Sequence, residues 1–306
     1  MMKKYFRLLL VFVIAIPFLL SGCGSVSTGL EGQGQYIIKA KEVNVVLNQE
    51  NTVLVDMQNS EDYAKGHVEG AVNIARKDIM IDIPVENMLA PKGKIEELLG
   101  SKGISNETMI VIYDNTNNMD SARFWWTLKV YGHENMKVVS GGLSALKSAG
   151  FKTSTEIPNV TKTKYTASDK NTDMIASNDE VKSQVNDPSK DVILLDTRTQ
   201  EEYDEGTVPG SILLDYIQNN YKDGTYKSIQ DIKIQYIENG INPEKTIIMY
   251  CKTSVRAAQT YLALYNAGYS NLKLYDEAWL GWSSHASYPI QRPEGTKIES
   301  NQQDNS

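Results

Sequence analysis

The chain has 306 residues, 41% of them apolar, and a formal net charge of −7 at pH 7. This length allows roughly two domains of about 100–200 residues each, with enough apolar residues for a core in both. The acidic balance argues against the basic surface that nucleic acids require, so we expect no nucleic-acid partner.

The N-terminus is typical of an export signal. A basic start at 1–7 precedes an apolar run from Leu8 to Leu20, which at about 13 residues is too short for a membrane span of about 20 and fits a secretory signal. Leu20-Ser21-Gly22-Cys23 is similar to a bacterial lipobox, which implies that Cys23 is diacylated and becomes the first mature residue. A plain signal peptide cleaved nearby is the alternative.

These features predict a signal peptide at 1–22 and a lipidated Cys23 followed by a Gly-, Ser- and Gln-rich flexible tether, together 23–39. We therefore expect an exported protein, lipid-anchored to the bacterial cell membrane and facing outside the cytoplasm. The chain has only two cysteines, Cys23 and Cys251. If Cys23 is lipidated, Cys251 is left as the free thiol of an exported protein, which indicates a reactive or intermolecular role.

Two halves of the chain repeat each other. The matched positions, each separated by 140 residues, are Asp56 with Asp196, Tyr63 with Tyr203, Gly66 with Gly206, and Gly70 with Gly210. Such self-similarity indicates a duplicated domain.

Each half is predicted to be an α/β domain. The apolar runs 109–113 and 246–250 are short and unalternating, as is typical of strands buried on both faces of a parallel sheet that is flanked by helices. Helical signals between such runs, as at 177–180, complete the alternation of strand and helix. We place domain 1 at 40–152, a polar linker at 153–171, domain 2 at 172–290, and a polar tail without regular structure at 291–306.

The strand at 246–250 leads into a loop that places a thiol at the start of a helix. The loop and its neighbours are Cys251, Lys252, Thr253, Ser254, Val255 and Arg256. A strand, a tight loop and a helix N-terminus in succession direct backbone N–H groups and partial positive charge into one small cup. The cup favours the thiolate, which is the nucleophilic form of cysteine, and suits an anion. A buried structural cysteine is the alternative.

Domain 1 differs from domain 2 at this loop. Asp114 replaces Cys251, and the loop is one residue longer when counted to the glycine at the end of the following helix. An acid at the mouth of an anion cup would repel an anionic substrate, so we expect domain 1 to be catalytically inactive. Phe124, Trp125 and Trp126 exceed the aromatic surface that one helix needs for its own core, and they predict burial against domain 2.

With these residues assembled, the chain resembles the rhodanese family of sulfurtransferases in its tandem-domain form. The resemblance rests on the runs 196–198, 201–203, 206–212 and 251–256, and on 122–126 and 131–133 for an inactive first domain. Thr207 stands where the family has histidine, and Glu277-Ala278 replaces a Gly-Gly pair. Ser254 stands where glycine is common, which puts the loop geometry in question because glycine eases unusual backbone angles.

The resemblance implies that Cys251 takes the outer sulfur of thiosulfate or 3-mercaptopyruvate as a persulfide and passes it to cyanide or a thiol. Residues 252–256 would bind the donor, with Arg256 either binding the anion or bracing the loop against a carboxylate. Arg198 is a further candidate for substrate contact, or scaffolding with Asp196. No cofactor is implied, and the spacing of the three histidines suggests no metal site. The expected partners are small-molecule sulfur donors and acceptors, the membrane through the anchor, and an acceptor protein as an open alternative.

Two other functions compete with this interpretation. Cysteine phosphatases use a thiolate in a similar cup, but with five residues between Cys and Arg, whereas Cys251 and Arg256 enclose the run 252–255. A lipid-anchored sulfur carrier or binding module without turnover would relay a persulfide to a partner. A steady-state assay with thiosulfate and cyanide separates a carrier from an enzyme.

Overall fold

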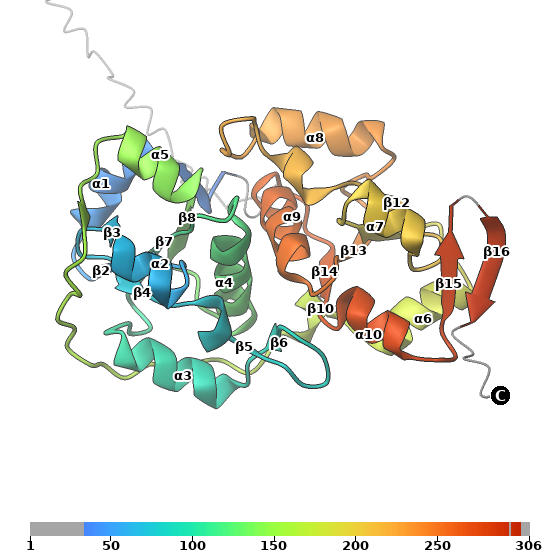
Figure 1. Ribbon diagram of the computed structural model, residues 1–306, viewed down its shortest axis with the longest axis horizontal. Helices are drawn as coiled ribbons and strands as arrows, with labels where there is room; N and C mark the ends of the chain where they lie inside the picture. The colour runs from blue at the N-terminus through green and yellow to red at the C-terminus, as the bar shows by residue number, and fades with distance from the viewer. Residues whose placement is uncertain (1–33, 294, 301–306) are drawn as a thin grey trace, which may run out of the picture.

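The computed structural model describes residues 34–293 and 295–300. Two domains lie side by side, with helices α4 (Met119–Val130) and α9 (Val255–Asn266) facing each other between them (Figure 1). The expected signal peptide, Cys23 and most of the expected tether lie outside the described residues. Within the described residues, none of the helices has the length and apolar character needed to cross a membrane.

Domain 1 is built on a parallel sheet with the strand order β1-β8-β7-β2-β4. Its strands are β1 (Ile37–Lys39), β2 (Thr52–Asp56), β4 (Val72–Asn73), β7 (Met109–Tyr113) and β8 (Met136–Ser140). Its helices, besides α4, are α1 (Val43–Leu47), α2 (Ser60–Lys65), α3 (Lys92–Ser101) and α5 (Gly142–Ser148). Two short antiparallel pairs join β3 (His67–Val68) to β9 (Thr153–Ser154) and β5 (Met80–Ile81) to β6 (Met88–Leu89).

Domain 2 repeats this topology with the strand order β10-β14-β13-β11-β12, again parallel. The strands are β10 (Ile175–Ala176), β11 (Val192–Asp196), β12 (Ile212–Leu213), β13 (Thr246–Tyr250) and β14 (Leu272–Tyr275). The helices, besides α9, are α6 (Asn178–Asn186), α7 (Gln200–Glu205), α8 (Ile229–Glu238) and α10 (Ala278–Ser284). The duplication and the α/β architecture predicted from the sequence are confirmed.

The central strands are buried on both faces because helices cover both sides of each sheet (Figure 1). In β7, Ile110, Val111 and Ile112 are fully buried although they alternate between the two faces. This explains why the strands read as continuous apolar runs instead of alternating patterns.

Aromatic side chains of α4 and α9 form the interface between the domains. The ring of Trp125 lies 6.2 Å from that of Tyr261 and 5.5 Å from that of Tyr265, measured between centroids. Tyr36 adds an edge-to-face contact with Trp125 at 5.2 Å. Such pairs stabilise an interface by about 0.5–1.5 kcal/mol each beyond their burial. The predicted burial of this helix against domain 2 is confirmed.

Two predicted boundaries, those of the tether and of the linker, need correction. The tether cannot extend to residue 39, because Tyr36 is buried and Ile37 begins a strand of the sheet. The linker starts after β9. The stretch that follows is held against domain 1 by backbone hydrogen bonds, such as those from Thr163 N to Gly100 O and from Ser168 N to Tyr131 O, both 2.9 Å. Its polar composition did not reveal these bonds, since backbone groups make them.

The polar tail is partly structured. β15 (Pro289–Arg292) and β16 (Gly295–Ser300) form an antiparallel pair, so the prediction of an irregular tail is wrong for this part. Gln291 also pairs its backbone with Thr207 of domain 2, at 2.8 and 3.0 Å. A strand on an edge needs backbone partners more than apolar side chains, and composition alone therefore misses it.

Candidate active site

Cys251 directly follows β13 at the carboxyl end of the domain 2 sheet and is 1% exposed. Only Lys252, Thr253 and Ser254 separate it from the first residue of α9, Val255. Ser254 is the N-cap residue and has a left-handed backbone, with φ 63° and ψ −9°. The first N–H groups of α9 have no partner within the helix, and the helix dipole adds positive charge at the same point.

The matching loop of domain 1 shows what such a cup binds. The Asp114 carboxylate accepts hydrogen bonds from the backbone N–H groups of Thr116 and Asn118, both at 3.0 Å, and from the N–H and hydroxyl of Ser121, both at 2.9 Å. From the sequence we expected Asp114 at the mouth of the cup. It is only 1% exposed, so it fills the cup instead. Burial, with Asp120 nearby, raises the pKa of Asp114 despite these donors.

Arg256 lies on the first turn of α9, next to the thiol. Its guanidinium donates two hydrogen bonds to Glu202 of α7, at 2.6 and 2.8 Å. Burial opposes its charge, but Glu202 and Cys251 together raise the pKa of Arg256, and the guanidinium in turn lowers the pKa of Glu202 against that carboxyl's own burial. The brace against a carboxylate is therefore confirmed, and the same cation also acts on Cys251.

The remaining loop residues divide by exposure. Lys252 is exposed at the rim, and Thr253 is half-buried. The side chains of Ser254 and Val255 are buried, so these two residues offer the cup their backbone rather than their side chains.

The Arg198 guanidinium is taken up by a buried scaffold. Its guanidinium, 2% exposed, binds Asp196 at 2.6–3.1 Å and the Gly206 carbonyl at 2.6 Å, and lies over the ring of Trp279. These contacts support the scaffolding interpretation. The assignment of Arg198 as a substrate-binding residue is therefore corrected. Thr207, which stands where the family has histidine, donates a hydrogen bond of 2.9 Å to Asp196 and belongs to the same scaffold.

Domain 1 contributes a cation that the sequence analysis missed. Arg76 pairs with Asp120 at 2.5 Å. Burial would lower the pKa of Arg76, but Asp120, Asp114 and Cys251 raise it, so its charge also acts on the thiol. A basic pair, Arg76-Lys77, shortly after the strand at 72–73 was the available signal.

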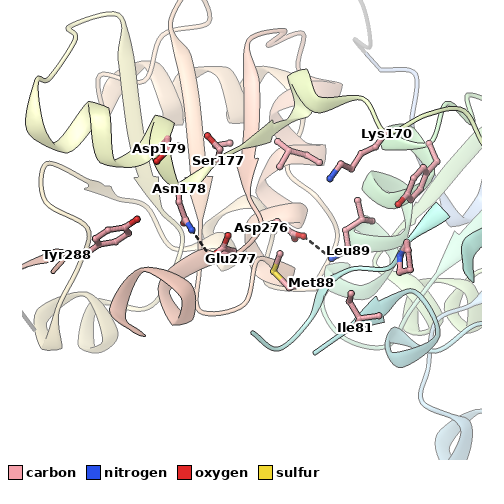
Figure 2. Close-up of a pocket in the computed structure, with 14 residues that line it drawn as sticks. Ile81, Met88, Leu89, Lys170, Ser177, Asn178, Asp179, Asp276, Glu277 and Tyr288 are labelled. Atoms are coloured by element: carbon pink, nitrogen blue, oxygen red, sulfur yellow. Dashed lines mark hydrogen bonds between the residues drawn. The ribbon is translucent and has the colours of Figure 1, made fainter. Parts of the chain in front are cut away.

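A groove of about 690 Å³ lies between the domains on another side of the loop. Figure 2 shows Asp276 in its wall with a hydrogen bond to the backbone N–H of Leu89, at 2.8 Å. Cys251 is not among its lining residues. The groove therefore does not include the thiol, and it is linked to the Cys251 loop through Asp276, which binds Ser254.

Comparison with known proteins places both halves in one family. The profile of the Rhodanese-like domain matches residues 39–149 and 177–285. The chain belongs to the rhodanese-like domain family. The two matches agree with the two sheets, and the tandem arrangement predicted from the sequence is confirmed.

Several relatives carry names that describe sulfur chemistry. A protein of Haloferax volcanii and one of Saccharopolyspora erythraea, each named "Putative thiosulfate sulfurtransferase", are both 28% identical to this chain. The alignments cover 76% and 81% of this chain and 86% and 93% of those proteins. "Sulfur carrier protein TtuD" of Thermus thermophilus is 26% identical over 76% of this chain and 87% of its own.

Solved structures share the fold. A structure of EanB with a cysteine persulfide and ergothioneine superposes with a TM-score of 0.76 at 21% identity, covering 85% of this chain and 71% of that one. The anaerobic ergothioneine biosynthesis enzyme of Chlorobium limicola gives a TM-score of 0.74 at 20% identity, covering 86% and 71%. At this identity the likeness concerns the fold alone.

Proposed function

We propose that the protein is a sulfurtransferase that moves a sulfane sulfur from thiosulfate or 3-mercaptopyruvate to cyanide or a thiol through a persulfide on Cys251. The observation that carries the proposal is the pair of cups. In domain 1 the cup holds a carboxylate, and in domain 2 the same loop carries a thiol beside Arg256. The names of the relatives from Haloferax and Saccharopolyspora support the same chemistry.

The reaction has two balanced halves. The Cys251 thiolate attacks the outer sulfur of thiosulfate, the S–S bond breaks, and its electron pair leaves with sulfite. With 3-mercaptopyruvate the C–S bond breaks, and the carbon takes the electron pair and a proton as pyruvate forms. The acceptor then attacks the terminal sulfur of the persulfide, and Cys251 leaves as the thiolate. Backbone N–H groups of the loop and Arg256 hold the anionic donor, with Lys252 at the rim.

Intact-protein mass spectrometry tests this proposal. We expect incubation with thiosulfate or 3-mercaptopyruvate to add one sulfur, about 32 Da, as a persulfide. Cyanide should remove it, and Cys251→Ser should gain none. Failure of the wild-type protein to gain sulfur from both donors would refute the proposal.

A sulfur carrier without turnover is the second candidate, favoured by the name of the Thermus relative. Such a protein would load Cys251 but release the sulfur only to a partner. Steady-state turnover of thiosulfate with cyanide or a small thiol identifies the enzyme, and single loading without turnover identifies the carrier.

We also propose that the protein is exported and lipid-anchored through Cys23, outside the cytoplasm. The proposal rests on the sequence of residues 1–23. Cys23→Ala should abolish acylation and leave the signal peptide uncleaved, which metabolic lipid labelling and membrane fractionation measure. A diacyl pair is enough for stable anchoring. Unchanged lipid labelling in the variant would contradict the proposal.

A further inference from the structure

The catalytic loop contains a backbone conformation that its residue type does not favour. Ser254 has φ 63°, in the left-handed region, and is completely buried. Any side chain with a Cβ is strained there, so other contacts must hold the residue in place. The position matters because Ser254 fixes the direction in which α9 and the N–H groups of the cup begin.

The contacts that hold Ser254 come from both domains. Arg123 of α4 donates from Nη1 to the Ser254 hydroxyl at 3.0 Å and forms an ion pair with Asp276 at 2.7 Å. The same hydroxyl lies 3.0 Å from Asp276 Oδ1 and 2.6 Å from the Thr253 carbonyl, either of which can accept its proton. Arg123 is fully buried, and Asp276 is almost so, so this pair is shielded from solvent.

Domain 1 also holds the far ends of this network. Arg123 Nη2 donates to the carbonyl of Asn87 at 3.0 Å, and Leu89 N donates to Asp276 at 2.8 Å (Figure 2). The guanidinium lies over the ring of Trp126, 4.5 Å from its centroid. The loop is therefore tied to two separate parts of the other domain, helix α4 and the segment 87–89.

The equivalent N-cap residue of the domain 1 loop is held without a buried charge. Asn118, the equivalent left-handed N-cap residue with φ 65°, donates directly to the Gly224 carbonyl of domain 2 at 2.9 Å and accepts from Gly141 N at 3.0 Å. Gly224 of domain 2 and Asn87 of domain 1 occupy equivalent positions in the repeat. Two residues after each of them, Tyr226 N and Leu89 N donate to the other domain, to Ser140 and Asp276 respectively. The shorter side chain of Ser254 does not span this distance, and Arg123 bridges it.

We propose that Arg123, on the domain without a thiol, is a positioning residue that holds Ser254 and thereby shapes the anion cup around Cys251. The inference rests on the proposed function for its effect on sulfur transfer. It concerns the geometry of the cup, however, and can be tested with any anion that reacts at the thiol.

Two substitutions at Ser254 separate strain from the loss of a hydroxyl. Ser254→Ala and Ser254→Gly both remove the contacts with Arg123 and Asp276, but only glycine adopts φ 63° without strain. We expect Ser254→Ala to lower the rate of persulfide formation by about 10-fold or more, and Ser254→Gly to lower it several-fold less than Ser254→Ala does, since small displacements at a reacting centre cost large factors in rate.

The test of Arg123 uses a combination. Arg123→Met should lower the rate at least as far as Ser254→Ala does, and adding Ser254→Gly should restore it to the level of Ser254→Gly alone. A purely structural role predicts no such rescue, because glycine does not compensate the unpaired Asp276. Thermal unfolding of each variant shows which are folded at the assay temperature. If Arg123→Met does not fold, the comparison of the two Ser254 variants decides the question.

A second readout does not depend on sulfur transfer. The rate of Cys251 alkylation by iodoacetate relative to neutral iodoacetamide, measured on the Cys251 peptide by mass spectrometry, reports the preference of the cup for an anion. We expect this ratio to fall in Ser254→Ala and Arg123→Met and to recover with Ser254→Gly. Equal ratios in wild type and Ser254→Ala, or no rescue by glycine in a folded Arg123→Met variant, overturn the inference. Normal ratios in a protein that gains no sulfur would refute the proposed function alone.

Discussion

The two halves of the molecule carry the same cup with different occupants. In domain 1 the chain supplies its own anion, and four donors close on Asp114. In domain 2 the smaller, softer side chain of Cys251 occupies the same point. The loop between strand and helix is also one residue longer in domain 1, since the N-cap is Asn118 there and Ser254 in domain 2. The cup of domain 1 is therefore filled by a side chain of its own loop, whereas the cup of domain 2 carries a thiol.

The residue on the first turn of the helix after the cup has opposite charges in the two domains. Asp120 of α4 occupies the position that Arg256 has in α9, and each is held by a partner of opposite sign, Arg76 and Glu202 respectively. Both halves keep an ion pair at this point, but only domain 2 places its cation on the helix that follows the loop, where α9 comes after the thiol of Cys251. The comparison teaches that the two cups differ together in occupant, in loop length and in the charge beside them.

The largest expected effect comes from removing one half altogether. Deletion of residues 36–152 should give an aggregation-prone second domain, because Tyr261 and Tyr265 lose Trp125, and Asp276 loses the guanidinium that neutralises it. Soluble yield and size-exclusion chromatography measure this, with full-length Cys251→Ser as the control for loss of activity alone. A soluble and fully active fragment 172–290 would show that the two cups work independently.

Removing the cation beside the cup of domain 2 should have the next largest effect. Arg256→Leu removes both the brace and the cation, and we expect persulfide formation to slow by roughly 100-fold, as when a single anion-stabilising donor is lost. Arg256→Lys keeps the charge but not the bidentate contact with Glu202, so its rate should lie between those of the wild type and Arg256→Leu. Stopped-flow or quenched mass spectrometry gives the rates. A wild-type rate in Arg256→Leu would remove this cation from the mechanism.

Emptying the cup of domain 1 should separate stability from activity. Asp114→Ala leaves the donors of Thr116, Asn118 and Ser121 without an acceptor, so the free energy of unfolding should drop by about 1–3 kcal/mol. Turnover should stay within a few-fold. Sulfate should restore part of the stability by entering the vacated cup, whereas chloride at equal ionic strength is the control. A large loss of turnover in a folded variant would assign domain 1 a part in the chemistry.

The smallest effect concerns pH. Because the pKa of Glu202 is lowered in the folded state, its pairing with Arg256 stabilises the protein fully above the unfolded value of about 4.3. This stabilisation is lost as the pH falls through the lower folded value. Urea unfolding between about pH 3 and 7 should show an acid loss of about 1 kcal/mol that Glu202→Gln lacks. Identical pH profiles would mean that the brace does not contribute to stability.

The sequence predicted what local patterns determine. Short apolar runs, the 140-residue repeat and the strand–loop–helix around Cys251 gave the fold and the cup, because each depends on neighbouring residues. The concern over Ser254 was also justified, since its φ lies in the left-handed region. Glu277-Ala278 shows the same departure from glycine, because Ala278 has φ 54°.

What the sequence did not reveal depends on contacts between distant residues. Arg123 contacts Ser254 across 131 positions of the chain, and no local pattern records such a pair. The available signal was a charged residue within the aromatic run at 122–126, since a buried arginine requires a buried partner. The stretch after β9 and the strand β16 were missed because backbone groups hold them, and their side chains read as polar.

The crossing contacts between the halves have a consequence for how the chain arose. Leu89 N binds Asp276 and Tyr226 N binds Ser140, which is one contact made in both directions, as in a two-fold homodimer. In a homodimer of identical chains, any residue changed on one side changes on the other. Joining the copies in one gene lifts that restriction, so Arg123 can stand on α4 while Gln259 occupies its place on α9. Two copies within one chain can therefore differ, so that one of them supports its twin.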